Sequence, residues 1–144
     1  MSLPFAFWDS SAIIPICVPQ IQTKQARALY KCYGMVVWWI TPAEMISGFT
    51  RLLRMGQIGS DQFHAAKQSA NELAMTWDSV HPSSRILSHA CALLEVHPLR
   101  AADALQLAAA LENFEHKPAG RVFVTADIRQ AEAARVCGFS VELI

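Results

Sequence analysis

The chain has 144 residues, of which 53% are apolar and 17% are charged, and its 12 basic and 12 acidic residues give a formal net charge of zero. This size predicts one domain over residues 1–144. The apolar content excludes a disordered chain, and the charge balance excludes a strongly basic nucleic-acid coat.

The first part of the chain predicts strands that alternate with helices. A short apolar strand over residues 5–8 leads into a helix that begins near Asp9. A helix over residues 22–33, which we expect Gly34 to stop, precedes a β-branched and aromatic strand over residues 35–40. This order is typical of a β-α-β arrangement.

The motif Thr41-Pro42-Ala43-Glu44 is typical of a helix start, with Thr41 as the N-cap and Glu44 closing a capping box. We expect this helix to reach Arg54. The helix after it should begin with Ser60 as its cap. Their predicted apolar faces are Met45, Phe49, Leu52 and Leu53 in the first helix, and Phe63, Ala66, Ala70, Leu73 and Ala74 in the second.

The second part of the chain continues the alternation. We expect a short strand over 76–80, helices over 82–95 and 99–111, a strand over 121–125, a helix over 128–137 that Gly138 ends, and a strand over 141–143. Such alternation predicts a mostly parallel sheet with helices on both faces, which is a three-layer α/β/α fold.

Three acidic residues lie at or just beyond the ends of predicted strands: Asp9 at the end of the first, and Glu44 and Asp127 one short turn after theirs. Ligand sites in open α/β sheets form beyond the carboxyl ends of the strands, so we expect these carboxylates to converge. Each has a plainer interpretation, as a helix cap for Asp9 and Asp127 and as part of a capping box for Glu44.

A fourth acid, Asp103, lies in a helix that is almost wholly apolar after Arg100. A carboxylate buried there would be costly unless it were paired or bound to a metal. The plainer alternatives are an ion pair with Arg100 and a solvent-facing position near the helix start. Four neighbouring carboxylates would repel one another, and Mg²⁺ or Mn²⁺ is the natural counter-charge for hard oxygen ligands.

Four blocks of the chain resemble the PIN-domain ribonucleases, and within them the VapC-type toxins of bacterial toxin–antitoxin pairs. The blocks read FWDSSAI from residue 7, TPAEMISGFTR from 41, LRAADALQLA from 99 and VTAD from 124. Their order and spacing match this family over nearly the whole chain. The resemblance implies a five-stranded parallel sheet.

The resemblance also implies a Mg²⁺ or Mn²⁺ site, in which four acids would be both metal ligands and catalytic residues. These four site acids are Asp9, Glu44, Asp103 and Asp127. Ser11 and Thr125 match positions where the family has hydroxyls that help to hold the site. Gln130 departs from the family, which usually has an apolar residue such as Leu there; we interpret this as a packing position. The implied partners are RNA, a small antitoxin and a second copy of the chain.

Basic residues near these blocks could contact RNA. Arg51 lies two turns after Glu44 on the same helix face, where it could steer the RNA backbone or form a structural ion pair. Arg100 is a weaker candidate for the same role. Three further basic residues share one helix face that is either a phosphate contact or simply solvated: Lys24, Arg27 and Lys31.

The sequence thus predicts a metal-dependent endoribonuclease that hydrolyses RNA phosphodiesters with a metal-bound water. Two alternatives stay open: a non-catalytic PIN-like interaction module, and a PIN nuclease of RNA processing. The chain lacks the D-x-D of phosphoaspartyl phosphatases, the P-loop and the dinucleotide fingerprint, which disfavours those α/β enzymes.

The cellular setting is predicted from cysteines and from the N-terminus. Cys17, Cys32, Cys91 and Cys137 are scattered without a C-x-x-C pair, which disfavours a zinc site, and we interpret them as reduced thiols. No basic stretch precedes the first apolar residues, and no apolar run approaches the roughly 18 residues of a membrane span. We therefore expect a cytoplasmic protein without a membrane anchor.

Overall fold

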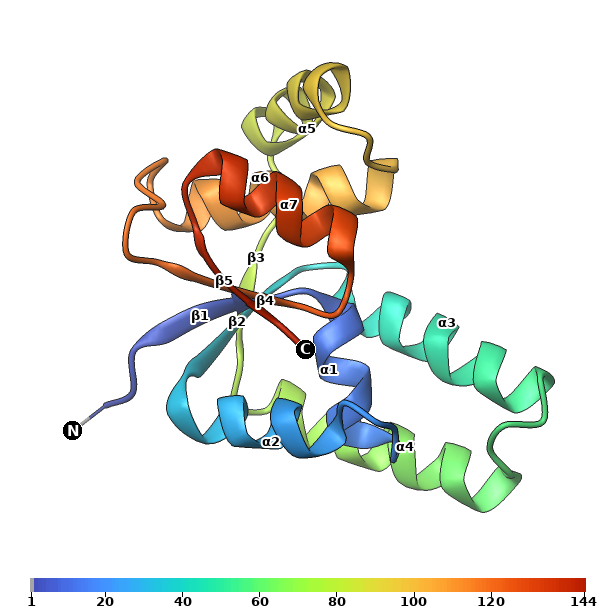
Figure 1. Ribbon diagram of the computed structural model, residues 1–144. Helices are drawn as coiled ribbons and strands as arrows, with labels where there is room; N and C mark the ends of the chain where they lie inside the picture. Colours follow the sequence, from blue (N-terminus) through green and yellow to red (C-terminus); the bar gives the residue numbers. More distant parts are fainter. Residues whose placement is uncertain (1) are drawn as a thin grey trace.

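The computed structural model describes residues 2–144, which form five strands and seven helices, with one or two helices between successive strands (Figure 1). The strands are β1 (Phe5–Trp8), β2 (Gly34–Trp38), β3 (Asp78–Val80), β4 (Val122–Thr125) and β5 (Ser140–Leu143). The helices are α1 (Ser10–Cys17), α2 (Thr23–Cys32), α3 (Thr41–Arg54), α4 (Ser60–Ala74), α5 (Ser84–Val96), α6 (Ala101–Asn113) and α7 (Ile128–Cys137).

All five strands form one parallel sheet in the order β3-β2-β1-β4-β5. β1 lies at the centre, where Phe7 pairs with Val36 of β2 on one side and with Phe123 of β4 on the other. The predicted five-stranded parallel sheet is confirmed. Because the strands are parallel, the residues that follow β1, β2 and β4 lie along one edge of the sheet.

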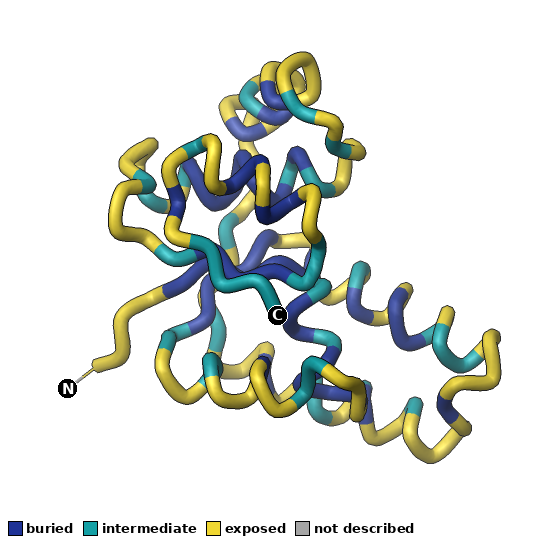
Figure 2. Tube along the Cα trace, in the orientation of Figure 1, coloured by how far each residue is buried: buried dark blue, intermediate teal, exposed yellow. Residues whose placement is uncertain are grey.

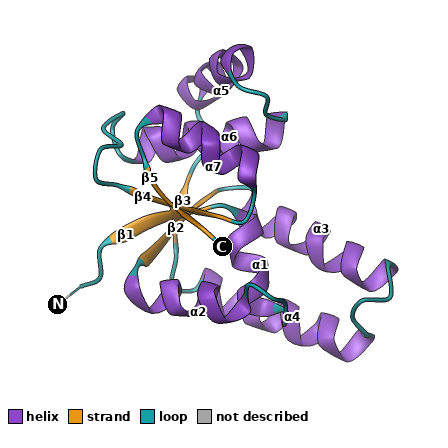
Figure 3. Ribbon diagram, viewed as in Figure 1, coloured by secondary structure: helices purple, strands orange, loops and turns teal. Residues whose placement is uncertain are grey.

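Helices cover both faces of the sheet (Figures 1 and 3). Alternate side chains of β1 point to opposite faces: Ala6 and Trp8 pack with helices α1 to α4, whereas Phe7 packs with α5, α6 and α7. Figure 2 shows the buried strands between these helical layers. The sheet is thus buried on both faces, which explains the high apolar content and confirms the three-layer α/β/α prediction.

The start of α3 differs from the predicted capping box. Ile40 takes the cap position, and Thr41 is the first helical residue, fully buried, with no partner for its hydroxyl among residues 2–144. The side chain of Glu44 bonds to α6 and does not return to the helix start. The capping-box prediction was wrong because a residue distant in the sequence binds the carboxylate in place of the local backbone.

Two glycines permit close approaches within the fold. We predicted that Gly34 would stop α2, but α2 ends at Cys32 and Gly34 is the first residue of β2. A Cβ at Gly34 would lie 2.8 Å from the ring of Phe5. A Cβ at Gly48 of α3 would lie 2.5 Å from Cδ1 of Ile14 in α1. The second approach brings α3 against α1, so that Glu44, one turn before Gly48, lies beside the start of α1.

Other helix ends follow their local signals closely. Ser83 caps α5 by accepting a hydrogen bond from the Ile86 N–H, and Gly138 ends α7 with a φ of 109°. α4 begins at Ser60, but Gly59 occupies its cap position, where the Gln62 side chain accepts from the Gly59 N–H. Ala74, predicted to face inward, is exposed at the end of α4.

The cysteines and the helix lengths bear on the predicted setting. All four cysteines are free thiols, and they range from the buried Cys17 to the exposed Cys32 and Cys91. Within residues 2–144, no helix combines the length and the apolar character that crossing a membrane requires.

Candidate active site

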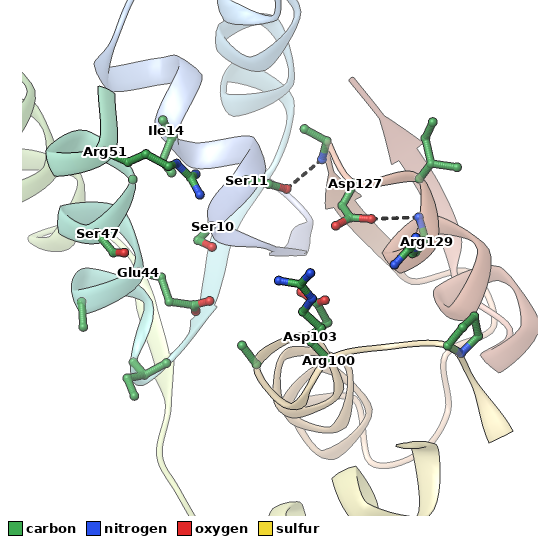
Figure 4. A pocket seen from close by; sticks show the side chains of 17 residues that line it. Ser10, Ser11, Ile14, Glu44, Ser47, Arg51, Arg100, Asp103, Asp127 and Arg129 are labelled. Atoms are coloured by element: carbon green, nitrogen blue, oxygen red, sulfur yellow. Dashed lines mark hydrogen bonds between the residues drawn. The ribbon is translucent and has the colours of Figure 1, made fainter. Parts of the chain in front are cut away.

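A cavity of about 990 Å³ lies where α1, α3, α6 and α7 begin, beyond the carboxyl ends of β1, β2 and β4 (Figure 4). Glu44, Asp103 and Asp127 line it directly. Asp9 follows β1 and directly precedes the lining residues Ser10 and Ser11, and only 4% of it is exposed. The fold therefore gathers all four site acids, although they come from four separate segments of the chain.

Asp9 is held by hydroxyl groups from two segments. Its Oδ2 accepts hydrogen bonds from Ser11 Oγ at 2.7 Å and from Thr125 Oγ1 at 2.8 Å. Asp9 occupies the N-cap position of α1 but makes no side-chain cap bond, so the plain cap interpretation does not apply. Burial raises the pKa of Asp9, and these two hydroxyls oppose that rise.

The same hydroxyls also bind the backbone after β4. Ser11 Oγ accepts from the Ala126 N–H at 2.9 Å, and Thr125 Oγ1 accepts from the Asp127 N–H at 3.0 Å. Thr125 is fully buried. Ser11 and Thr125 are the hydroxyl positions that the resemblance singled out, and here each links Asp9 to the segment that carries Asp127.

Glu44 is held from the opposite side by a glutamine. Gln106 of α6 is fully buried, and its Nε2 donates to Glu44 Oε1 at 2.6 Å. Burial, followed by the charges of Asp9 and Asp103, raises the pKa of Glu44 to about 7, although the hydrogen bonds from Gln106 and Ser10 act against the rise. Sequence reasoning missed Gln106. Its signal was a polar residue in an apolar helix, one turn after Asp103.

Asp103 is less buried than the apolar sequence around it indicated. α6 begins at Ala101, so Asp103 lies in the first helical turn and is partly exposed. This matches the solvent-facing alternative, since free N–H groups at a helix start favour a carboxylate. No ion pair joins it to Arg100 within the described chain. Partial burial and then the charges of Asp9 and Asp127 raise the pKa of Asp103.

Asp127 caps α7, as its plainer interpretation expected. Its Oδ1 accepts from the backbone N–H groups of Arg129 at 2.8 Å and of Gln130 at 3.2 Å. The same side chain lines the cavity (Figure 4). Capping therefore fixes the orientation of this carboxylate without removing it from the site.

Gln130 does more than pack. It is fully buried, as expected of a packing position, but its Nε2 donates to the backbone carbonyl of Asp103 at 2.9 Å. This bond joins α7 to the first turn of α6. The departure from an apolar residue thus adds a polar link between the segments that carry Asp103 and Asp127.

Arg51, the remaining predicted site residue, also lines the cavity. The ion pairs formed within residues 2–144 are those of Glu112 with Arg85 and with His116. The structural ion pair considered for Arg51 is therefore not present, and none of the four site acids is paired with a basic side chain.

The donor set suits a hard divalent cation. The site offers carboxylate oxygens, the ligands that Mg²⁺ and Mn²⁺ prefer, and no basic side chain in the described chain offsets their charge at ion-pair distance. Residues 2–144 contain no group of three or more His, Cys, Asp or Glu side chains already at metal-binding spacing. Mg²⁺ keeps several of its waters and needs only one or two carboxylates, so these residues fit it.

The fold resembles solved toxin structures. VapC20 of Mycobacterium tuberculosis, described as a sarcin-ricin loop cleaving toxin, has a TM-score of 0.64 and 18% identity, over 89% of this chain and 94% of that one. A toxin–antitoxin complex from Klebsiella pneumoniae has a TM-score of 0.63 and 16% identity, over 87% and 88%. VapBC2 of Rickettsia felis, bound to a promoter DNA fragment, has a TM-score of 0.63 and 12% identity, over 96% and 98%.

Sequence comparison adds no closer relative: no protein-family model matches this chain, and no curated protein matches it. The likeness is therefore one of three-dimensional structure, and at sequence identities of 12% to 18% it shows the fold alone. On that ground, the chain has the PIN-domain fold, in agreement with the resemblance drawn from its four sequence blocks.

Proposed function

We propose that this protein is a Mg²⁺- or Mn²⁺-dependent endoribonuclease and the toxin of a toxin–antitoxin pair. The observation that carries the proposal is the gathering of the four site acids at one open cavity, where no ion pair within residues 2–144 neutralises them. Such uncompensated negative charge destabilises the fold, so a structural role alone does not account for it. The shared fold with toxins supports the proposal.

The four site acids would hold the cation. When bound, it would supply an activated water and positive charge at the departing 3′ oxygen of an RNA phosphodiester. The protein's own contribution is orientation. Ser11 and Thr125 fix the Asp9 carboxylate, and Gln106 fixes that of Glu44. These bonds exist before substrate binds, so little reorganisation is needed at the moment of reaction.

The proposed partners are an RNA substrate, a small antitoxin and a second copy of the chain. One structural neighbour is described as a sarcin-ricin loop cleaving toxin, and others were solved as toxin–antitoxin complexes or bound to DNA. By analogy, an antitoxin would bind this protein and block the cavity. The presence of all four site acids at or beside one cavity disfavours the non-catalytic alternative.

The decisive experiment is cleavage of a mixed RNA pool by purified protein, with Mg²⁺ or Mn²⁺ and with EDTA. We expect metal-dependent cleavage that Asp9→Asn and Asp103→Asn abolish. Asp61→Asn is the matched control, because Asp61 is an exposed acid in the first turn of α4, outside the cavity. Folded, partner-free protein that binds no Mn²⁺ by calorimetry and cleaves no RNA would refute the proposal.

A further inference from the structure

Three arginines surround the site acids, and only one of them stood out in the sequence as a strong candidate. Arg51 comes from α3, Arg100 from the residue before α6, and Arg129 from the first turn of α7. Figure 4 shows Arg51 on the α1 and α3 side of the cavity, Arg129 on the α7 side, and Arg100 beside Asp103 between them. These cavity arginines therefore extend across the whole opening.

None of the three cavity arginines forms an ion pair with the carboxylates of the described chain. All three side chains are exposed, and none forms an ion pair within residues 2–144. The charge of Arg100 lowers the pKa of Asp103, but less than burial and the charges of Asp9 and Asp127 raise it. Cations that line an acidic cavity without pairing with its acids remain free to bind an anion that enters it.

A guanidinium group is well suited to phosphate. It is planar, stays charged at every working pH, and donates two parallel hydrogen bonds to the oxygens of one phosphate. Neighbouring phosphates of an RNA strand repeat at a regular spacing, so three arginines on different sides of a cavity can each bind a different phosphate.

We propose that Arg51, Arg100 and Arg129 bind the RNA backbone phosphates that flank the cleaved bond, so that the strand crosses the cavity from α3 to α7. This inference rests on the proposed function, because it takes RNA as the substrate. It assigns the arginines to substrate binding and leaves the chemistry to the acids.

The same helices provide matched controls. Arg54 lies one turn after Arg51 in α3, and Arg135 lies in the last turn of α7, which also carries Arg129. Both are exposed, and neither lines the cavity. Replacing them removes the same charge from the same helix, so any difference between the two sets reports position and not net charge.

The test measures binding of a fluorescein-labelled single-stranded RNA of mixed sequence to Asp9→Asn protein in Mg²⁺, by fluorescence anisotropy over a range of salt concentrations. Each phosphate contact contributes about 0.7 to the slope of log affinity against log salt for a single strand. The slope is negative, and we expect Arg51→Gln, Arg100→Gln and Arg129→Gln each to make it shallower by about this amount. Arg54→Gln and Arg135→Gln should leave it unchanged.

Equal slopes for cavity and control variants would overturn the inference, and so would RNA that does not bind. The binding assay requires no cleavage, so the two proposals fail separately. Metal-dependent cleavage with unchanged slopes would refute the arginine assignment alone. Shallower slopes in a protein that never cleaves would support the assignment and refute the nuclease. In the active protein, the arginine variants should raise KM more than they lower kcat.

Discussion

Asp9 and Glu44 are both carboxylates at the same edge of the sheet, yet their surroundings differ. On the β1 and β4 side, Asp9 accepts two hydroxyl bonds, and both hydroxyls in turn accept backbone N–H groups. On the α3 and α6 side, Glu44 is held mainly by the bond from Gln106 of α6, with a weaker contribution from the Ser10 hydroxyl. There the Thr41 hydroxyl and the Gln106 Oε1 have no hydrogen-bond partner among the described residues.

The difference teaches which part of the site is pre-set and which part is free to adjust. A closed network of hydrogen bonds holds Asp9 in one orientation, since moving it would leave several buried polar groups unpaired. The main partner of Glu44 is Gln106, whose own Oε1 has no hydrogen bond among the described residues, so fewer linked bonds hold this carboxylate in place. We infer that cation binding alters the Glu44 side more than the Asp9 side.

The largest effect is expected at the rigid side. Asp9→Asn should lower RNA cleavage by more than about 100-fold. This exceeds the loss of activity that is usual when a residue that only hydrogen-bonds to a metal ligand is replaced. In EDTA at pH 8 the same variant should melt at a higher temperature, because it removes a buried like charge. Cleavage assays and thermal melts check both. A variant that loses stability and keeps activity would indicate a structural acid.

The next effect concerns the hydroxyl network itself. Thr125→Val keeps the shape of the side chain but removes one donor to Asp9 and the acceptor of the Asp127 N–H. We expect about 10- to 100-fold weaker metal binding or activity, and a loss of roughly 1–3 kcal/mol of stability from the unpaired N–H. Mn²⁺ calorimetry and urea unfolding measure these changes. Thr50→Val, outside the cavity, should change neither.

Replacing the two buried glutamines should show how much activity depends on the bond to Glu44 and how much on the bond to the Asp103 backbone. Gln106→Leu removes the side-chain donor at Glu44, so activity should fall roughly tenfold while the protein stays folded. Gln130→Leu removes only a bond to the Asp103 backbone carbonyl, so its effect should be smaller. Single-turnover cleavage rates of both variants provide the comparison. A larger loss for Gln130→Leu would reverse our ranking of the two positions.

The smallest effect is a pH dependence of stability. The folded pKa of Glu44 is about 7, above its ordinary value of 4.5, so the folded protein binds more protons than the unfolded chain between these values. Stability should therefore fall as pH rises from 4.5 to 7. Glu44→Gln should flatten this part of the profile, as followed by thermal melts in EDTA. Identical profiles for the two proteins would exclude Glu44 as the titrating group.

Local sequence signals determined most of the framework. The apolar runs predicted the strands, and residues such as Ser83 and Gly138 marked the helix ends, because capping depends on neighbours within a few positions. Acids placed directly after strands could be assigned to one edge of the sheet, because parallel strands share that edge. The cavity of the structure gathers Asp9, Glu44 and Asp127, predicted in this way, together with Asp103, which stood out as an acid in an apolar helix.

Only the tertiary structure determined which side chains form hydrogen bonds with one another. Gln106 reaches Glu44 across 62 positions, and Gln130 reaches Asp103 across 27, and no local pattern encodes those contacts. The exposure of Asp103 likewise depended on where α6 begins within the packed layers. Sequence alone placed Asp9, Glu44 and Asp127 near the sheet edge, because each follows a strand within a few residues and parallel strands share that edge. Their hydrogen bonds and burial depend on helices brought together by packing, so these emerged only from the folded structure.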